Sequence, residues 1–443
     1  MAQIKVIGAG LAGCEAAYAA ARMGVDVILY EMKPQKYSPA HKSPLFGELV
    51  CSNSLKAKQI NNASGVIKEE LRILGSLIMQ AADKAEVPAG GALAVDRDIF
   101  SQYITDAVRN HPRITVVECE IDSFDDSITV CATGPLTSDK MASYIADNIG
   151  GDMLHFFDAA APIVDASSID RDKVFAASRY GKGEASYLNC PMTKEEYDAF
   201  YDALINARVA PLHDFDRASP QVFEGCMPVE IMASRGYDTL RFGPLKPVGL
   251  PDPKTGVEPY AVVQLRQENL RADMYNLVGF QTNLTFDEQK RVFGLIPGLE
   301  KASFHRYGVM HRNTFLNSPQ LLSADYSMRE RKNIFVAGQM TGVEGYLEST
   351  SSGMVAGINA ARRALGLDSV IFPQTTVIGA LASYISDPNV TSFQPMNANF
   401  GVVASLDRKV TGGKKARHEA IGMRAVETMR ENFSHLFDEN KEN

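Results

Sequence analysis

The hydrophobic pattern at the start of the chain predicts a strand, a tight turn, a helix and a second strand. The apolar residues 4–7 lead into the glycine-rich residues 8–13, and small or apolar side chains then continue to Gly24. Residues 25–30 read as the second strand, and Glu31 follows it. Two short apolar runs on either side of a helical segment are typical of a βαβ unit.

The pattern continues with further strands and a helix through the first third of the chain. Apolar residues recur at helical spacing from 98 to 110, and residues 116–117 and 128–134 read as strands. The last of these strands ends in Ala-Thr-Gly-Pro, which is a tight turn. Ligands of α/β sheets collect at the carboxyl ends of strands, so we expect a binding site there.

The middle of the chain has a different pattern. Between about 165 and 305, proline and glycine interrupt short apolar runs, and residues 262–265 and 276–280 read as antiparallel strands. Residues 333–339 then resemble a buried strand, and a helix of small residues is predicted over 349–365. We therefore predict a Rossmann-like α/β domain of two parts, 1–165 and 306–443, interrupted by an inserted α+β domain, 166–305.

The glycine turn and the acid after the second strand together indicate a dinucleotide site. Glycines of this spacing allow a tight turn, a close approach of the backbone to a pyrophosphate, and close packing of helix on strand, while the acid binds a ribose. The pyrophosphate would lie at the N-terminus of the helix. The candidate cofactor-binding residues are Gly8, Ala9, Gly10, Leu11, Ala12, Gly13 and Glu31.

This motif leaves NAD and FAD open, but the late strand–helix junction favours FAD. Gly338 and Gln339 end the predicted strand at 333–339, and small residues follow. A flavin dinucleotide is long enough to contact both the first turn and such a junction. No second GxGxxG marks a separate nicotinamide domain. We therefore predict an FAD-binding fold of the glutathione-reductase type.

Composition and charge restrict the other possibilities. The chain has 443 residues, 45% hydrophobic residues and a formal net charge of −8, which argues against a generally basic nucleic-acid-binding surface. A local basic stretch contains Lys409, Lys414, Lys415 and Arg417. A solvated surface is the default interpretation of such a stretch. No apolar run reaches the length of a membrane span, and no secretory leader is evident.

Six scattered cysteines, without a CxxC pair, predict no metal site and reduced thiols in the cytoplasm. Cys51 and Cys226 lie in predicted loops, where each is either a small buried hydrophobe or a nucleophile. Cys14, Cys119 and Cys131 are predicted core residues. The polar cluster that contains His311 and Arg312 fits either an anion or heterocycle site, or surface hydrogen bonding at a domain junction.

Long and specific segments occur along nearly the whole chain: GAGLAG at 8–13, YEMKP at 30–34, PAH at 39–41, LVCSNSL at 49–55, VPAGGALAVDR at 87–97, ATGPLTS at 132–138, DAAAPIV at 158–164, YLNCPMT at 187–193, FEGCMP at 223–228, RYGVMHRNTF at 306–315, AGQMTGVEGY at 337–346 and FQPMNANFG at 393–401. Together these segments resemble one family, the folate- and FAD-dependent tRNA (uracil-5-)-methyltransferases. The longer flavoproteins of the GidA type share the first motif but lack the CSNS and EGCMP pair.

The resemblance implies transfer of a one-carbon unit from 5,10-methylenetetrahydrofolate to C5 of an RNA uridine, usually the T-loop uridine 54 of tRNA. It implies that reduced FAD supplies electrons and that NAD(P)H reduces the flavin. By resemblance, Cys226 adds to uracil and Cys51 is the second essential thiol. The basic stretch becomes a set of RNA-phosphate candidates, and His311 and Arg312 become folate-site candidates. A ribosomal RNA target, and a flavin oxidoreductase without an RNA substrate, remain the alternatives.

Overall fold

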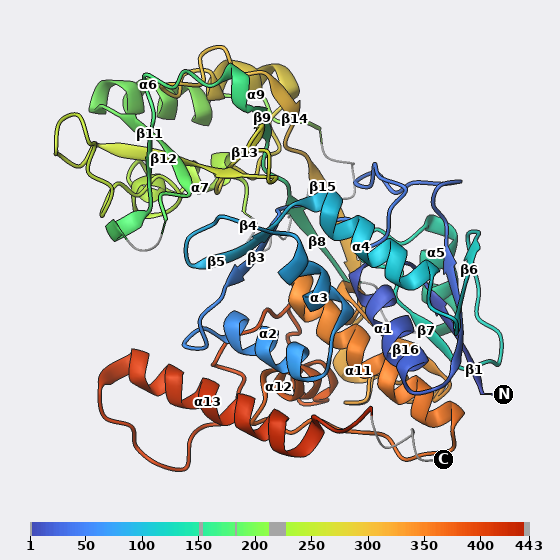
Figure 1. Cartoon of the computed structure of the whole chain (residues 1–443). Coiled ribbons are helices and arrows are strands. Elements are labelled where there is room, and N and C mark those ends of the chain that lie inside the picture. Colours follow the sequence, from blue (N-terminus) through green and yellow to red (C-terminus); the bar gives the residue numbers. More distant parts are fainter. Residues whose placement is uncertain (1, 150–153, 182–183, 212–226, 438–443) are drawn as a thin grey trace.

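The computed structural model describes residues 2–149, 154–181, 184–211 and 227–437. Its elements form a larger body and a smaller one, and each has a hydrophobic core of its own (Figure 1). No helix within these residues combines the length and hydrophobicity that a membrane span requires.

The larger body is built on a five-stranded parallel sheet. The register aligns Ile7 with both Tyr30 and Cys131, so the carboxyl ends of three strands lie at one edge of the sheet. The last strand comes from the C-terminal third of the chain, which confirms the predicted return to the first fold. In spatial order the strands are β16 (Ile334–Val336), β7 (Thr129–Cys131), β1 (Gln3–Ile7), β2 (Asp26–Glu31) and β6 (Ile114–Glu118).

Two small-residue helices pack closely behind this sheet. α1 (Leu11–Arg22) and α11 (Tyr346–Ala364) lie side by side, and α11 begins three residues before the predicted start. A Cβ added to Gly353 would lie 2.2 Å from the carbonyl oxygen of Ala12, and one added to Gly357 would lie 2.4 Å from that of Ala16. The two backbones are therefore in contact, and neither position has room for a side chain.

We expect Gly357→Ala to destabilise the protein by about 2 kcal/mol or more, because overpacking a tight contact costs about 1–3 kcal/mol. An unconstrained helical glycine would show the opposite sign, since alanine is favoured there by about 1 kcal/mol. Gly91→Ala is the control, because no atom lies within 4 Å of its added Cβ. Urea unfolding of the two variants checks this, and equal midpoints would contradict it.

The other helices of the larger body surround the sheet and a small three-stranded sheet. α13 (Gly413–Phe433) packs on α2 (Ala63–Ile73), and its buried side chains include Ile421, Ala425 and Met429. The elements are β3 (Ser54–Ala57), α2 (Ala63–Ile73), α3 (Leu77–Lys84), β4 (Glu86–Val87), β5 (Ala92–Val95), α4 (Arg97–Arg109), α5 (Asp139–Ile149), α10 (Ser318–Leu321), α12 (Val377–Ser386) and α13 (Gly413–Phe433).

The smaller body contains a six-stranded antiparallel sheet flanked by helices. In order, its strands are β10 (Phe175–Ala177), β11 (Tyr187–Met192), β12 (Ala261–Gln267), β13 (Met274–Leu277), β9 (Ile163–Asp165) and β14 (Phe304–Arg306). Its helices are α6 (Lys194–Ile205), α7 (Val229–Ser234), α8 (Thr239–Phe242) and α9 (Phe286–Phe293). The antiparallel pair β8 (Leu154–Ala159) and β15 (Met310–Phe315) joins it to the larger body. The domain limits at 165 and 305 stay a prediction.

Candidate functional site

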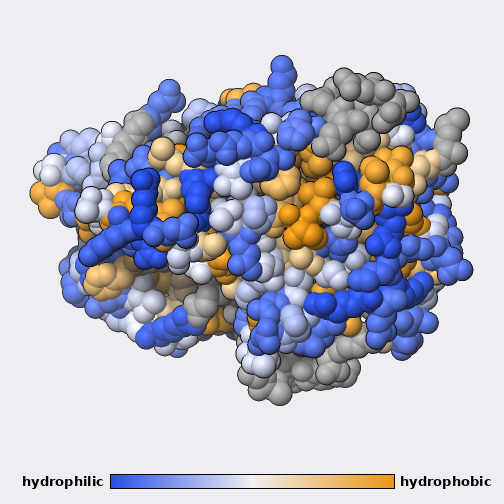
Figure 2. All heavy atoms as spheres, turned by 90° about the horizontal axis from the view of Figure 1, so that it is seen from below, coloured by the Kyte–Doolittle hydropathy of each residue, from blue (hydrophilic) through white to orange (hydrophobic). Residues whose placement is uncertain are grey.

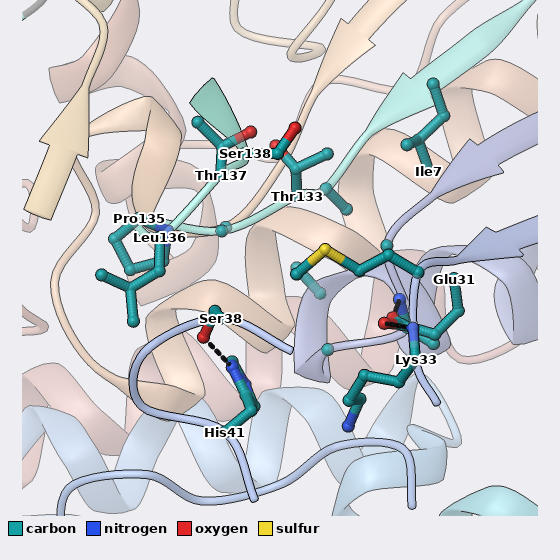
Figure 3. Close-up of a pocket in the computed structure, with 18 of the residues that line it drawn as sticks. Ile7, Glu31, Lys33, Ser38, His41, Thr133, Pro135, Leu136, Thr137 and Ser138 are labelled. Atoms are coloured by element: carbon teal, nitrogen blue, oxygen red, sulfur yellow. Dashed lines mark hydrogen bonds between the residues drawn. The ribbon is translucent and has the colours of Figure 1, made fainter. Parts of the chain in front are cut away.

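The main pocket lies at the carboxyl edge of the parallel sheet, where the glycine turn follows β1. The turn after β7 and the start of the segment after β16 complete its walls (Figure 3). Residues far apart in the chain thus meet at one edge. Those that line the pocket include Gly8, Ala9, Gly10, Leu11, Ala12, Glu31, Lys33, Ser38, His41, Glu48, Val50, Cys119, Thr133, Pro135, Leu136, Thr137, Ser138, Gly338, Gln339 and Tyr346.

Two glycines of the turn have no room for a side chain, because backbone atoms lie too close, and a third has open space beside it. Gly8 has φ +98°, and a Cβ there would lie 2.6 Å from the carbonyl oxygen of Ala132. A Cβ at Gly13 would lie 1.7 Å from the carbonyl oxygen of Gly8, so Gly13 packs the turn without lining the pocket. Gly10 has nothing within 4 Å of an added Cβ. This opening lets a ligand approach the backbone.

The start of α1 has the features of an anion site. Gly10 is its N-cap and provides no side-chain hydrogen bond, and the first turn carries no acidic residue. The first N–H groups of a helix have no acceptor within the helix, and its dipole favours negative charge there. The turn therefore fits a pyrophosphate.

The carboxylate of Glu31 is fixed beside this turn. Its Oε2 accepts a hydrogen bond from the backbone N–H of Ala9 at 2.7 Å, and its Oε1 accepts one from that of Lys33 at 2.9 Å. Each carboxylate oxygen can accept more than one hydrogen bond. Glu31 therefore lies where an acid could also accept from ribose hydroxyls, next to the pyrophosphate cradle.

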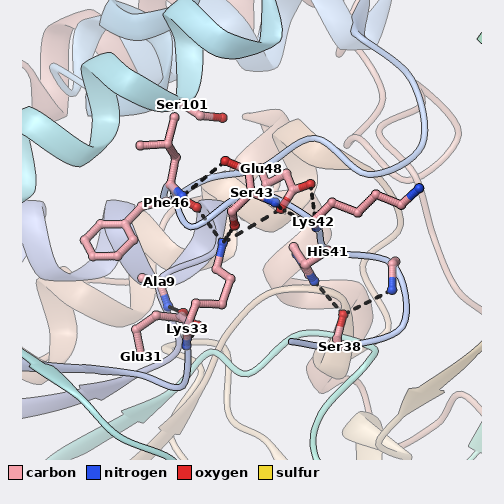
Figure 4. Close-up of polar contacts among 12 residues, drawn as sticks. Ala9, Glu31, Lys33, Ser38, His41, Lys42, Ser43, Phe46, Glu48 and Ser101 are labelled. Atoms are coloured by element: carbon pink, nitrogen blue, oxygen red, sulfur yellow. Dashed lines mark hydrogen bonds and ion pairs between the residues drawn. The ribbon is translucent and has the colours of Figure 1, made fainter. Parts of the chain in front are cut away.

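A loop of residues 33–50 covers one side of the pocket, and a buried lysine organises it (Figure 4). Lys33 donates from Nζ to the carbonyl oxygens of Ser43 at 3.1 Å and Leu45 at 2.5 Å. Its Nζ also lies 3.9 Å from a carboxylate oxygen of Glu48. Glu48 in turn accepts from the backbone N–H groups of Lys42 and Ser43. The sequence reasoning missed this loop, because it has neither helical nor strand periodicity.

His41 lies on the same loop and lines the pocket. Its Nδ1 is 2.6 Å from the hydroxyl oxygen of Ser38, and both lie across the pocket from the turn after β7 (Figure 3). Burial lowers the pKa of His41 below its usual value of 6.5. The imidazole is therefore neutral at pH 7, and it presents a hydrogen-bonding group without adding charge.

A further wall of the pocket is formed by the start of the C-terminal βα connection. Gly338 has φ +80° and precedes a short 3-10 turn, Gln339–Thr341. Gln339 donates to a carboxylate oxygen of Glu344 at 2.8 Å, and burial raises the pKa of Glu344 to about 8. A Cβ added to Gly338 would lie 3.3 Å from the Cβ of Ala12, so Gly338 lies next to the first turn of α1, and Gly338 and Gln339 line the same pocket as the glycine turn. The turn, the acid and this second contact together fit an adenine dinucleotide of the length of FAD.

Cys51 lies directly beside this pocket. Its backbone N–H donates at 2.8 Å to the hydroxyl of Tyr346, which lines the pocket, and its Sγ lies 3.7 Å from the carbonyl oxygen of Ala159. Arg97 donates to the carbonyl oxygen of Cys51 at 3.3 Å, and Arg306 donates to that of Val50. Two guanidinium groups therefore hold the backbone that carries the half-buried thiol.

Other predicted site residues are placed differently or lie outside the description. Cys226 lies outside the described residues. His311 and Arg312 lie on β15, paired with Asp158 and Phe157 of β8, but their side chains are outside the described part. The basic residues do not line the pocket: they are exposed at or just before the start of α13, on the mainly hydrophilic lower side of the molecule (Figure 2). These are Lys409, Lys414, Lys415 and Arg417.

One cysteine assignment is wrong. Cys119 is not a core residue: β6 ends at Glu118, and Cys119 is half-buried in the pocket wall. The predicted strand at 116–117 lies within β6 (Ile114–Glu118), and Cys119 follows it where the chain enters the pocket wall. Cys14 and Cys131 are buried as predicted, and Cys190 is buried in β11. Within the described residues, no group of three or more His, Cys, Asp or Glu side chains is placed to hold a metal ion.

Comparison with known proteins identifies the class of fold. The family model described as "Glucose inhibited division protein A" matches residues 3–368. The structure of Aquifex aeolicus GidA in its form II crystal has a TM-score of 0.70 at 18% identity, and the match covers 99% of this chain and 76% of that chain. The form I crystal gives a TM-score of 0.68. The protein therefore has the FAD-binding α/β fold of this class.

Curated relatives identify the family within that class. Methylenetetrahydrofolate--tRNA-(uracil-5-)-methyltransferase TrmFO of Acetivibrio thermocellus is 59% identical over 432 residues, which cover 97% of this chain and 98% of that protein. The TrmFO of Ligilactobacillus salivarius is 56% identical over 99% of this chain and 100% of that protein. The chain belongs to the TrmFO family of methyltransferases, which confirms the resemblance found in the sequence.

Proposed function

We propose that this chain transfers a one-carbon unit from 5,10-methylenetetrahydrofolate to C5 of a uridine in tRNA. The proposed target is the T-loop uridine 54, which would become ribothymidine. The observation that carries the proposal is the position of Cys51. Its backbone N–H is hydrogen-bonded to Tyr346, which lines a pocket that fits FAD, so a thiol lies beside that pocket. The names of the full-length relatives supply the donor and the type of RNA.

A thiol is needed because uracil C5 is a weak nucleophile. Addition of a thiolate to C6 would give an enolate, and this makes C5 reactive. We assign this addition to Cys226 and a second essential role to Cys51. The contacts of Arg97 and Arg306 with the carbonyl groups of Cys51 and Val50 fix the backbone that carries this thiol. The proposed role of Cys51 is to hold or pass a proton during the reaction.

The proposed flavin explains why a methyltransferase has this fold. A methylene group is one reduction step short of a methyl group, and bound FAD, with NAD(P)H as its reductant, would supply the hydride. Gly8, Gly10 and the start of α1 would hold the pyrophosphate, and Glu31 the ribose. Gly338 and Gln339 would contact the other part of the dinucleotide. His311 and Arg312 remain the candidates for the folate side.

The proposed RNA contacts are the exposed basic residues around the start of α13. Lys414 and Lys415 lie in its first turn, where the helix dipole is also positive. Cations at that end are unfavourable for the helix itself, which supports a role toward an anion such as phosphate. Lys409 and Arg417 would extend the same contact, which positions RNA without reading its sequence. The target base would then leave its stack to reach the thiols. We propose the cytoplasm as the place of action, from the free cysteines.

Transfer of labelled carbon tests the proposal. Purified protein, unmodified tRNA transcript, NAD(P)H and methylene-labelled tetrahydrofolate should give label in 5-methyluridine at position 54. Label at another position, or in ribosomal RNA alone, would replace the proposed target. NAD(P)H oxidation with a small acceptor and no label in either RNA would instead favour a flavin oxidoreductase.

A further inference from the structure

The segment that carries Cys51 is fastened to the smaller body by a buried arginine. Arg266, near the end of β12, is only 7% exposed. Its Nε donates to Oδ1 of Asn53 at 2.9 Å, and its Nη2 donates to the hydroxyl of Ser52 at 2.6 Å. Two N–H groups of one planar guanidinium thus fix the two residues that follow Cys51.

Contacts in the opposite direction complete this connection. The amide nitrogen of Asn53, which is fully buried, donates to the carbonyl oxygens of Gln267 at 3.0 Å and of Val95 at 3.1 Å. One of these carbonyls belongs to the smaller body and the other to the larger. Asn53 therefore joins the two bodies immediately beside the thiol.

A second guanidinium holds the other side of the same segment. Arg97, at the start of α4, donates to the carbonyl oxygens of Leu49 and Cys51. Its Nε also lies 2.7 Å from the carboxylate of Glu268, which is 2% exposed and belongs to the smaller body. A buried charged pair of this kind is costly to desolvate, and it specifies geometry more than stability.

Both chain connections between the bodies also meet this segment. The Sγ of Cys51 faces the carbonyl oxygen of Ala159, where β8 leads into the smaller body. Arg306, at the end of β14 on the return connection, donates to Val50. The place of Cys51 is thus set from the smaller body at several points, and the fork of Arg266 is the most specific of them.

We propose that Arg266 is a positioning residue for Cys51. Through Arg266, the position of the smaller body determines the position of the thiol. This inference rests on the proposed role of Cys51 in methyl transfer. The fork sets both the distance and the angle of the segment, which an ammonium group on a flexible chain does not do. Loss of the Arg266 guanidinium should therefore misplace Cys51 without causing loss of bound FAD.

The test compares Arg266→Gln and Arg266→Lys with Arg271→Gln in the full-length, FAD-loaded protein. Arg271 lies on the β12–β13 hairpin, is 78% exposed and pairs only at the surface with Asp273, so it is a matched control. For each variant we would measure the iodoacetamide labelling rate of the Cys51 peptide, the kcat and KM of tRNA methylation, and the flavin content.

For Arg266→Gln we expect about tenfold faster labelling of Cys51 and a kcat lower by about 10- to 100-fold, as a misplaced reacting group causes. The KM for the folate donor and the flavin content should stay near wild type. Arg266→Lys should be intermediate, since it can reach one acceptor, and Arg271→Gln should match wild type.

Wild-type labelling and kcat in Arg266→Gln would overturn the proposal, as would a loss of activity that simply follows a loss of flavin. If Arg266→Gln does not fold, Ser52→Ala removes one acceptor of the fork and must show the same faster labelling. A Cys51→Ala variant that methylates normally would refute the proposed role of Cys51, while the labelling rates would still decide whether Arg266 positions it.

Discussion

A Gly13→Ala variant is expected to lose its bound flavin and to unfold at a lower temperature. The added Cβ would lie 1.7 Å from the carbonyl oxygen of Gly8, and both positions belong to the backbone of one tight turn. Relief requires the turn to open, so we expect a loss of roughly 3 kcal/mol or more in the free energy of unfolding. Thermal unfolding and the ratio of flavin to protein absorbance check this.

Gly10→Ala is the matched control, because it should affect the binding of FAD without affecting the stability of the fold. No atom lies within 4 Å of its added Cβ, and alanine for glycine at an N-cap changes stability only modestly. The methyl group would stand where the pyrophosphate approaches. We therefore expect a melting temperature near wild type for the apoprotein but weaker binding of FAD. Unchanged FAD affinity in Gly10→Ala, or a Gly13→Ala variant that behaves like wild type, would contradict the assigned cradle.

The second large effect is expected from Cys226→Ala, which should abolish methyl transfer and retain FAD. Without the thiolate that adds to C6, uracil C5 stays unreactive, and loss of a nucleophile lowers turnover by several orders of magnitude in other enzymes. Methyl incorporation into tRNA and the flavin spectrum of the same preparation give the two readouts.

Cys190→Ala is the control for this variant. Cys190 is fully buried in β11 of the smaller body, and burial raises the pKa of its thiol, so it stays neutral. We expect it to keep its activity, with at most a modest loss of stability. Full activity of Cys226→Ala would remove Cys226 from its role. If Cys51→Ala were then the inactive variant, Cys51 would be the residue that adds to uracil.

The sequence predicts the parts of this molecule whose signals are local. The glycine spacing, the apolar run over residues 25–30 and the acid at 31 lie within one βαβ unit, and the turn and Glu31 meet as expected. The helix over 98–110 and the late small-residue helix follow from their spacing in the same way. The family was also evident, because long and specific segments match along the whole chain.

The rest of the site depends on contacts between distant residues. Arg266 and Asn53 are 213 positions apart, and no periodicity links them. Lys33 and His41 lie on an irregular loop whose course is set by hydrogen bonds of the Lys33 and Glu48 side chains to its own backbone. Cys119 shows a further limit, since a strand pattern does not reveal where the strand ends and the pocket begins.

The most direct test of the central claim uses tRNA tritiated at C5 of its uridines. Substitution at C5 must release this tritium into water. We predict release that requires methylenetetrahydrofolate and reduced flavin, equals the methyl groups formed, and disappears in Cys226→Ala. Methyl groups formed without tritium release, or release that does not depend on the folate donor, would contradict reductive methylation of uracil C5 by this protein.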